Sequence, residues 1–540
     1  MEPVGLALTF DVLSRTDNEA AGSVLLAALD SWHASLQEHA LAAILKRAHP
    51  AGHREVLARL HQVPDSWRPI LQRYHSRLLP VCRQALLGGD AQLCANACLA
   101  AQWFRVYDLV PTLLLALEEA NHPQADLIAQ TLMELVNLLC AELGSLRPLQ
   151  GGDSPALVRR RLISVLETAV GRYGRHQRRE VLEAFAALVN RDNLTLKQVL
   201  DNPHHSAFIP LVDLLARSPQ RSILRLVLGF LDDPQAPSAA LSVIARRNDP
   251  EFVAALLRKI GREPSAVVAQ NLRRMGSIAW ARNSTLLEKL GDAEQHAAVR
   301  LLMASAAPRR EVFGCIEWML THGKPAGRRA AAEALARFHG AEANRLALRA
   351  LADKDPDVQA KVIVQLRSRG IPGALNRILA LVDSPSPAVR AAVRKSLPEF
   401  HFDRFLADFD MLDDATRRST GSLVRKVDPR CLSRLWEEMR SRVRRRRLRA
   451  LAVARALQLE SKVEESILRL LHDEDHMIRA EAAATLAACR TPAARLGLTE
   501  ALEDRSPVVQ EAARKALEAQ GIEAEPSPPP VARRAAEAPP

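Results

Sequence analysis

The sequence of 540 residues is poor in aromatic side chains, in glycine, in paired cysteines and in long apolar runs. Aromatic residues make up only 4% of the chain and there are 23 glycines, whereas Ala, Leu and Arg are abundant. Because β-sheets favour aromatic and β-branched residues, this composition favours closely packed α-helices. The hydrophobic share of 48% allows a large buried core that needs no disulfide or metal.

The seven cysteines are scattered and form no CxxC motif. A disulfide framework or a zinc site needs such pairs, so the spacing predicts reduced, mostly buried thiols. The sequence also contains no run of about 18 apolar residues, and its first residues lack a basic segment followed by a long apolar core. We therefore expect a cytoplasmic protein that is not inserted in a membrane.

Signatures of the common catalytic mechanisms are absent, including the Walker A loop, GxGxxG, HExxH, GxSxG and the kinase motifs. Cys94 and Cys98 lie four residues apart and could hold a metal, but core packing explains them better. The segment from His472 to His476 is rich in possible ligands, but its aspartates suit a turn and a helix cap. We expect no enzyme activity, no cofactor and no metal site.

The C-terminal half contains an internal repeat. Four segments align without gaps, namely Asp355 to Leu366, Ser386 to Leu397, Asp475 to Leu486 and Ser506 to Leu517. Each begins with Asp or Ser, a good N-cap, and three continue with Pro at the first helical position. Apolar residues follow three, seven and eleven positions on, which is one face of a helix. Each segment therefore predicts the first helix of a repeat unit.

A second apolar segment follows each first helix after a short turn and predicts a second helix. It ends before an aspartate that opens the next unit, and Asp353, Asp383, Asp473 and Asp504 lie about 30 residues apart or multiples of it. Helices of only about three turns fit this period. The pattern predicts an all-α fold, an α-solenoid in which helix pairs of about 30 residues stack as a right-handed superhelix.

The regularity of the repeat divides the chain. Regular units are expected over residues 232–522, irregular helical repeats over 1–150 and further helical repeats over 151–231. The segment Leu146 to Ser154 contains Pro, two Gly and Asp, which predicts a hinge or a long loop. Residues 523–540 are rich in Pro and Ala without an apolar face, so we expect a disordered tail.

The cap, the Pro, the apolar positions and the closing Asp recur together over residues 232–522. In this the chain resembles the short bacterial HEAT-like repeats, the group that includes the phycobilisome-lyase type, with an armadillo-type superhelix. The resemblance implies an extended concave surface that binds a partner, although such repeats serve unrelated functions. We expect a non-catalytic scaffold for protein–protein interaction.

A net charge of +12 favours acidic partners, whether acidic proteins, nucleic acid or anionic membranes. The segment from Arg440 to Arg455 carries eight arginines and no acid. As a helix, it would group Arg442, Arg446 and Arg449 on one side, opposite an apolar face. These three residues and Arg445 form the first candidate surface for an anionic partner, because arginine binds carboxylates and phosphates in bidentate geometry.

A second basic region follows the predicted hinge, with Arg159, Arg160, Arg175 and Arg179 as its candidate binding residues. For both regions the alternative is a solvated surface whose arginines pair with acids of neighbouring units. The second alternative is nucleic-acid binding through these basic regions, in a protein that resembles the HEAT-like DNA glycosylases. Those enzymes also need a base pocket with aromatic and carboxylate groups, and no such group of residues can be placed in this sequence. A chromophore-lyase-like role, implied by the repeat pattern alone, is the third alternative.

Overall fold

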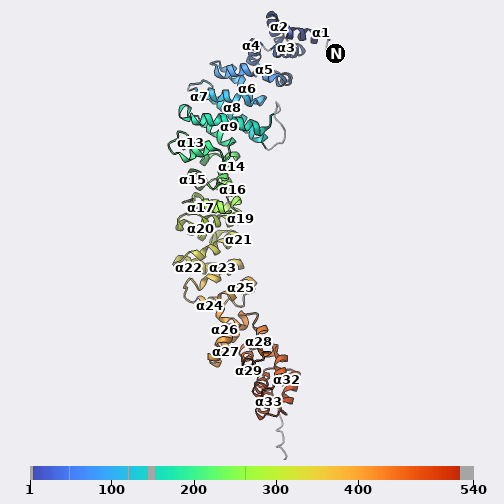
Figure 1. Cartoon of the computed structure of the whole chain (residues 1–540), viewed down its shortest axis with the longest axis vertical. Coiled ribbons are helices and arrows are strands. Elements are labelled where there is room, and N and C mark those ends of the chain that lie inside the picture. Colours follow the sequence, from blue (N-terminus) through green and yellow to red (C-terminus); the bar gives the residue numbers. More distant parts are fainter. Residues whose placement is uncertain (1–3, 48, 120, 144–152, 262, 523–540) are drawn as a thin grey trace, which may run out of the picture. The chain divides into compact units, whose positions relative to one another are not determined.

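A computed structural model describes residues 4–47, 49–119, 121–143, 153–261 and 263–522. Within these ranges every regular element is a helix, either one of 33 α-helices or one of nine short 3-10 helices (Figure 1). The chain divides into two compact units, Met1–Gly327 and Arg328–Pro540. The predicted all-α solenoid is confirmed.

The helices of the first unit pack against partners that are near in chain order. Among the close pairs, α11 contacts α13, α13 contacts α15 and α16 contacts α19, which are two or three helices apart. The α-helices are α1 (Val4–Arg15), α2 (Ala20–Leu29), α3 (Ala34–Arg47), α4 (Pro50–Ala58), α5 (Arg68–Leu87), α6 (Ala91–Trp103), α7 (Val110–Glu118), α8 (Ala125–Glu142), α9 (Pro155–Gly171), α10 (Tyr173–His176), α11 (Arg179–Leu188), α12 (Leu194–Asp201), α13 (Phe208–Arg217), α14 (Arg221–Gly229), α15 (Ser238–Arg246), α16 (Pro250–Ile260), α17 (Ala266–Arg273), α18 (Ser284–Lys289), α19 (Asp292–Ala304) and α20 (Arg309–His322).

The second unit contains the regular repeats. Its strongest helix contacts join α23 to α25, α27 to α29, α29 to α31 and α31 to α33. The remaining α-helices of the chain are α21 (Pro325–Ala334), α22 (Ala341–Ala350), α23 (Pro356–Leu366), α24 (Ala374–Leu379), α25 (Pro387–Ser396), α26 (Phe402–Asp408), α27 (Asp414–Val427), α28 (Cys431–Met439), α29 (Arg444–Leu457), α30 (Glu464–Leu470), α31 (His476–Leu486), α32 (Pro492–Ala501) and α33 (Pro507–Ala519).

The four aligned segments form α23, α25, α31 and α33, each beginning one residue after its predicted cap. They contain 11, 10, 11 and 13 residues, which confirms helices of about three turns. Their apolar positions form the core. Val389 and Val393 of α25 and Leu397, which directly follows it, are all buried. Packing of this face against the neighbouring first helices holds the stack together.

A hydrogen bond recurs at the turn before each of these helices. The side chain two residues before the cap accepts the amide of the cap residue, at 2.8 Å for Asp353, 3.0 Å for Asp473, 2.8 Å for Asp504 and 3.4 Å for Ser384. The second of the four predicted turn residues was placed one residue too early, because the turn begins at Ser384. Asp383 lies outside the turn and instead bonds the Lys426 ammonium group at 2.5 Å.

A second bond closes the same turn from inside the helix. Six residues after the turn begins, the side chains of Gln359, Arg390, Arg479 and Gln510 donate to the carbonyl of its first residue at 2.7 to 2.8 Å. The two bonds together fix how the chain enters each first helix. A glutamine or arginine stands four residues after the cap in all four aligned segments, but the period of the repeat does not predict a hydrogen bond from it.

The predicted caps differ in what they do. The carboxylates of Asp355 and Asp475 accept amides of the first helical turn, as expected of an N-cap. Ser386 and Ser506 occupy the same position but make no side-chain cap bond. There the preceding turn bonds hold the chain, so the serine caps were predicted at the right place with the wrong interaction.

The predicted division into residues 1–150, 151–231, 232–522 and 523–540 remains a prediction. Residues 144–152, which include most of the expected hinge, and the tail 523–540 lie outside the described residues. The boundary between the compact units falls at Gly327, inside the stretch that we expected to be one run of regular repeats.

Two helices of the second unit approach each other most closely at Gly421. A methyl group added there would overlap the backbone carbonyl of Ala456, so α27 and α29 can pack only with glycine at this position. We predict that Gly421→Ala lowers the free energy of unfolding by about 1–3 kcal/mol, because the backbone of α29 has to shift. Urea denaturation of the full chain measures the effect.

The control for this substitution is Gly314→Ala. Gly314 lies in α20, where an added methyl group meets nothing within 4 Å. Alanine is the better helix former, so this variant should be as stable as the wild type or more stable by up to about 1 kcal/mol. Equal effects of the two substitutions would contradict the close-approach explanation.

Candidate functional site

The arginine-rich segment of the second unit is not one helix. α28 ends at Met439 and α29 begins at Arg444, so Arg442 lies in the turn between them and does not share a helix face with Arg446 and Arg449. The prediction of one continuous helix was wrong because the run of arginines contains no Gly or Pro to mark the turn. Val443, in extended conformation, precedes α29 instead.

Acidic side chains pair with most arginines of α29. The Arg446 guanidinium donates to both Glu438 oxygens, with Nε–Oε2 at 2.8 Å, and this bond lowers the pKa of Glu438. Arg445 lies 2.9 Å from Asp410. Arg449 is more weakly held, at 3.9 Å from the same carboxylate. Binding of an anionic partner by these residues stays a prediction, and such a partner would compete with the internal acids.

Two further arginines of α29 link neighbouring repeats. Arg447 Nε lies 2.8 Å from Asp473, and Arg444 Nε lies 2.5 Å from Asp475. Arg479 makes the same link one unit later, with Asp504. Each pair joins a first helix to the turn of the next unit. These arginines therefore hold the stack, and among the described residues only Arg442 of the predicted first surface has no acidic partner.

The second predicted region lies on α9, α10 and α11. Arg159 is half-buried and its Nε donates to the Leu188 carbonyl at 2.6 Å, while Arg179 lies 3.9 Å from an Asp213 oxygen. Arg160 and Arg175 are exposed, and no bond of their side chains occurs within the described ranges. The four residues do not gather at one point, but Arg159 lines a groove described below.

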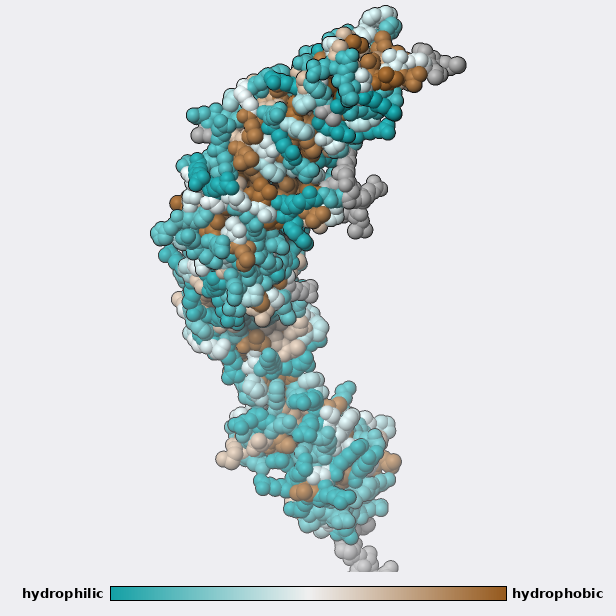
Figure 2. Space-filling view, turned by 45° about the horizontal axis from the view of Figure 1, so that its top comes forward, coloured by the Kyte–Doolittle hydropathy of each residue, from teal (hydrophilic) through white to brown (hydrophobic). Residues whose placement is uncertain are grey.

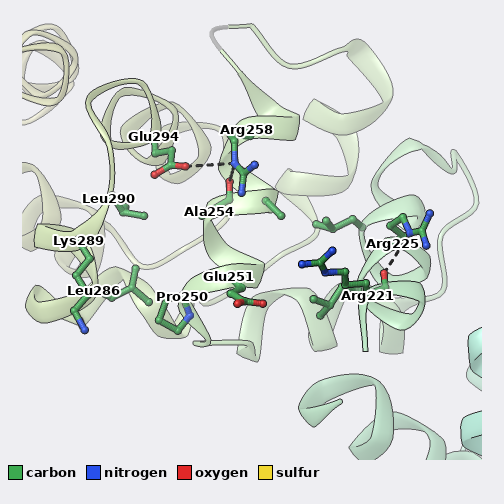
Figure 3. A pocket seen from close by; sticks show the side chains of 13 residues that line it. Arg221, Arg225, Pro250, Glu251, Ala254, Arg258, Leu286, Lys289, Leu290 and Glu294 are labelled. Carbon is green, nitrogen blue, oxygen red and sulfur yellow. Dashed lines mark hydrogen bonds and ion pairs between the residues drawn. The ribbon is translucent and has the colours of Figure 1, made fainter. Parts of the chain in front are cut away.

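Hydrophilic residues cover most of the face drawn in Figure 2, and apolar residues form separate patches between them. A hollow of about 840 Å³ lies in the first unit (Figure 3). We call it the Ala254 groove. It is lined by Arg221, Leu224, Arg225, Leu228, Pro250, Glu251, Ala254, Ala255, Arg258, Leu286, Lys289, Leu290 and Glu294.

Most residues that line the Ala254 groove come from α14, α16 and α18, while Leu290 follows α18 and Glu294 belongs to α19. α16 forms the floor, where the half-buried Ala254 and Ala255 leave space that larger side chains would fill. Leu228 of α14 borders one side of this floor, and the buried Leu286 and Leu290 border the other. The residues from each helix recur three or four positions apart, so each helix turns one face towards the groove. The result is an apolar strip that crosses three helices.

Basic side chains stand on both sides of the apolar strip. Arg221 and Arg225 come from α14 and Lys289 from α18, on opposite sides of the groove in Figure 3. All three are exposed, and within the part of the chain that the structure describes none of them pairs with a carboxylate. Arg258 differs, because its Nε lies 3.4 Å from Glu294. The groove therefore offers unneutralised positive charge beside apolar surface.

A second hollow, of about 590 Å³, adjoins the first along α14, and we call it the Asn190 groove. It is lined by Cys140, Ala141, Leu143, Arg159, Ala187, Leu188, Val189, Asn190, Arg191, Asp192, Ser222, Arg225, Leu226 and Gly229. Arg191 is partly neutralised by Asp192 and Asp232, each 3.5 Å away. Arg225 lines both grooves.

No sequence pattern predicted the Ala254 groove. Its residues come from four helices, in a stretch where the repeat period is weak. Arg221 and Arg225, four positions apart beside Leu224 and Leu228, were the available signal of a basic and apolar helix face. The sequence alone does not predict that α14, α16 and α18 lie with these faces towards the same hollow.

The expected readings of the possible metal ligands hold. Cys94 and Cys98 are buried in the core, and Asp473 and Asp475 serve the turn and the cap of α31. No group of three or more His, Cys, Asp or Glu residues suited to a metal ion occurs among the described residues. Within the same residues no helix has both the length and the apolar character needed to span a membrane.

The carboxylates of the repeat turns link stability to pH. Hydrogen bonds from Arg444 lower the pKa of Asp475 to about 2, and Arg479 lowers that of Asp504 in the same way. A folded-state pKa below the unfolded value of about 3.9 stabilises the fold above that pH, and the contribution is lost as pH falls towards the folded value. We predict that Asp475→Asn flattens the fall in unfolding free energy between about pH 4 and pH 2.

Asparagine is chosen for this variant because it also caps helices, so that α31 keeps its N-cap. Urea denaturation at a series of pH values gives the unfolding free energy of both proteins. Above about pH 5 the two curves should run parallel, with the variant less stable. A variant with the full acid dependence of the wild type would show that this carboxylate does not contribute.

The comparisons with known proteins identify the repeats. The family model of HEAT repeats matches residues 314–398 and 429–518, which include all four aligned segments. Among curated proteins none matches this chain.

Solved structures that align with the chain have low identity and low TM-scores. Human deoxyhypusine hydroxylase in complex with glycerol is 19% identical, over 45% of this chain and 96% of its own, with a TM-score of 0.18. An engineered protein is 15% identical over 93% of this chain and 99% of its own, with a TM-score of 0.18. The karyopherin Kap121p bound to the SUMO protease Ulp1p is 11% identical, over 96% of this chain and 72% of its own, with a TM-score of 0.23.

Proposed function

This chain carries HEAT repeats over residues 314–398 and 429–518, and we propose that it is a non-catalytic scaffold that binds a protein segment in the Ala254 groove. The observation that carries the proposal is the apolar strip across α14, α16 and α18 with basic side chains on both sides. Solenoids bind partners along such surfaces, where many small contacts add up. Binding of this kind needs no catalytic residue.

The lining of the groove favours protein over nucleic acid as the partner. Its floor consists of Leu and Ala side chains, which apolar residues of a peptide can cover. Nucleic acid would use aromatic side chains for base stacking and a run of basic groups for phosphates. The groove contains no aromatic residue, and the carboxylates of Glu251 and Glu294 would repel phosphate.

The distribution of arginine pairs supports the same choice. In α29 the guanidinium groups of Arg444, Arg446 and Arg447 already bond carboxylates, so a phosphate backbone would have to displace those acids. Arg221 and Arg225 in the Ala254 groove are not occupied in this way. Free basic groups beside apolar surface suit carboxylates and apolar side chains of one protein segment.

The proposal predicts the effect of charge reversal in the groove. Peptides are first selected for binding to the full-length chain from a phage-displayed library of random segments. Their affinity should fall about tenfold or more in Arg221→Glu, because a favourable rim charge becomes repulsive, and Ala254→Trp should also weaken binding by filling the floor. Fluorescence anisotropy with labelled peptides measures the dissociation constants.

The matched control is Arg246→Glu. Arg246 is an exposed arginine at the end of α15, in the same unit but outside the groove, and it has no partner within the described ranges. Its reversal should leave peptide affinity within about twofold. The proposal fails if peptides bind all variants equally, or if the library yields no binder while oligonucleotides bind with a steep salt dependence.

A further inference from the structure

The Asn190 groove and the Ala254 groove meet at one helix. Residues 221, 224, 225 and 228 of α14 line the Ala254 groove, whereas residues 222, 225, 226 and 229 line the other. These two sets occupy adjacent faces of the same helix, about 100° apart. Arg225 belongs to both, so its guanidinium stands at the point where the hollows join. A segment bound in one groove reaches the other by passing this side chain.

The Asn190 groove has the groups that a peptide main chain requires. The side chains of Asn190 and Ser222 make no hydrogen bond within the described residues, so an amide and a hydroxyl are free to bond a partner. Two backbone carbonyls of the groove are already occupied, since Arg159 bonds the Leu188 carbonyl and Arg191 bonds that of Gly229. Side chains, rather than the protein's own main chain, would make the polar contacts.

The charge of the two grooves selects an acidic partner. Together they contain six basic side chains and three acidic ones. Two of the basic groups, Arg221 and Arg225, have no carboxylate partner in the described part of the chain and lie on consecutive turns of α14. Carboxylates of a partner would neutralise them, while apolar side chains cover the floor of α16. A segment without carboxylates would leave the arginines unpaired, and a segment without apolar side chains would leave the floor of α16 exposed to water.

From this arrangement we infer that one extended, acidic protein segment with interspersed apolar residues fills both grooves, crossing α14 beside Arg225. The inference rests on the proposed function and adds the chemistry of the partner and the path that it takes. Arg225 bonds a carboxylate at the crossing, and Asn190 and Ser222 bond the main chain beyond it. Arg221 and Lys289 attract acidic residues on the two sides of the Ala254 groove.

A cysteine provides a direct test of this path. Cys140 lines the Asn190 groove and is half-buried, whereas the other six cysteines of the chain are buried. Burial raises the pKa of the Cys140 thiol, so alkylation is slow enough to follow in the folded protein. A segment lying in the Asn190 groove covers this sulfur. A segment confined to the Ala254 groove leaves it accessible.

The experiment measures the rate of Cys140 alkylation by iodoacetamide in the full-length chain, by peptide mass spectrometry. The probe is a random copolymer of glutamate and tyrosine, compared with polyglutamate and with a single-stranded oligothymidylate at equal charge concentration. We expect the copolymer to slow alkylation at least fivefold, and polyglutamate to protect less because it lacks apolar side chains. Each rate is compared with that of the same protein without probe.

Variants test whether one segment occupies both grooves. Arg221 lines only the Ala254 groove, so Arg221→Glu can reduce protection of Cys140 only by weakening a segment that spans the two. We expect this variant to need about tenfold more copolymer for half-maximal protection, and Arg246→Glu to behave as the wild type.

Three outcomes would overturn the inference. If the selected peptides bind in the Ala254 groove but the copolymer neither binds nor protects, the partner is not of this acidic class and the proposed function stands. If copolymer binding depends on Arg221 while the Cys140 rate stays unchanged, the segment does not cross α14. If oligothymidylate protects Cys140 as well as the copolymer does, the two grooves bind nucleic acid instead of a protein segment.

Discussion

The stack of the second unit depends on how each repeat begins. An aspartate or serine side chain accepts the amide two residues ahead, and a glutamine or arginine six residues on returns a bond to the carbonyl of the same residue. A turn fixed at both its amide and its carbonyl has little freedom in where the next helix starts. Where this geometry repeats, at α23, α25, α31 and α33, the first helices begin in the same way and their apolar faces pack against one another.

Arginine side chains of this chain have two different roles, as one example from each unit shows. In the second unit, Arg479 is almost fully buried and pairs with Asp504, so the charge bonds one unit to the next. Such a pair stabilises only because both partners are present, since a lone buried guanidinium would be costly. In the first unit, Arg221 and Arg225 of α14 line an open groove and pair with no carboxylate among the described residues. Arg479 therefore joins two repeats, whereas Arg221 and Arg225 remain available at the surface.

This difference explains why a count of arginines did not locate the candidate site. The run at Arg444 to Arg449 is the most basic stretch of the sequence, yet most of its charges face acids that lie far along the chain, such as Asp473 and Asp475. Sequence distance hides these pairs, because the partner sits on the next repeat. The Ala254 groove carries fewer arginines but leaves them available, and only the positions of three helices decide that.

By itself the sequence determined the helical class, the period of about 30 residues, the start of α23, α25, α31 and α33, and the burial of their apolar faces. These features are local, since a cap, a proline and a helical period act within one or two turns of chain. The structure showed that neither serine cap bonds and that α28 ends before Arg444, because backbone conformation at those turns is not set by residue type alone. Tertiary structure decided which basic side chains remain unpaired. Their acids lie 26 positions away for Arg447 and 35 for Arg445, a distance that no local pattern encodes.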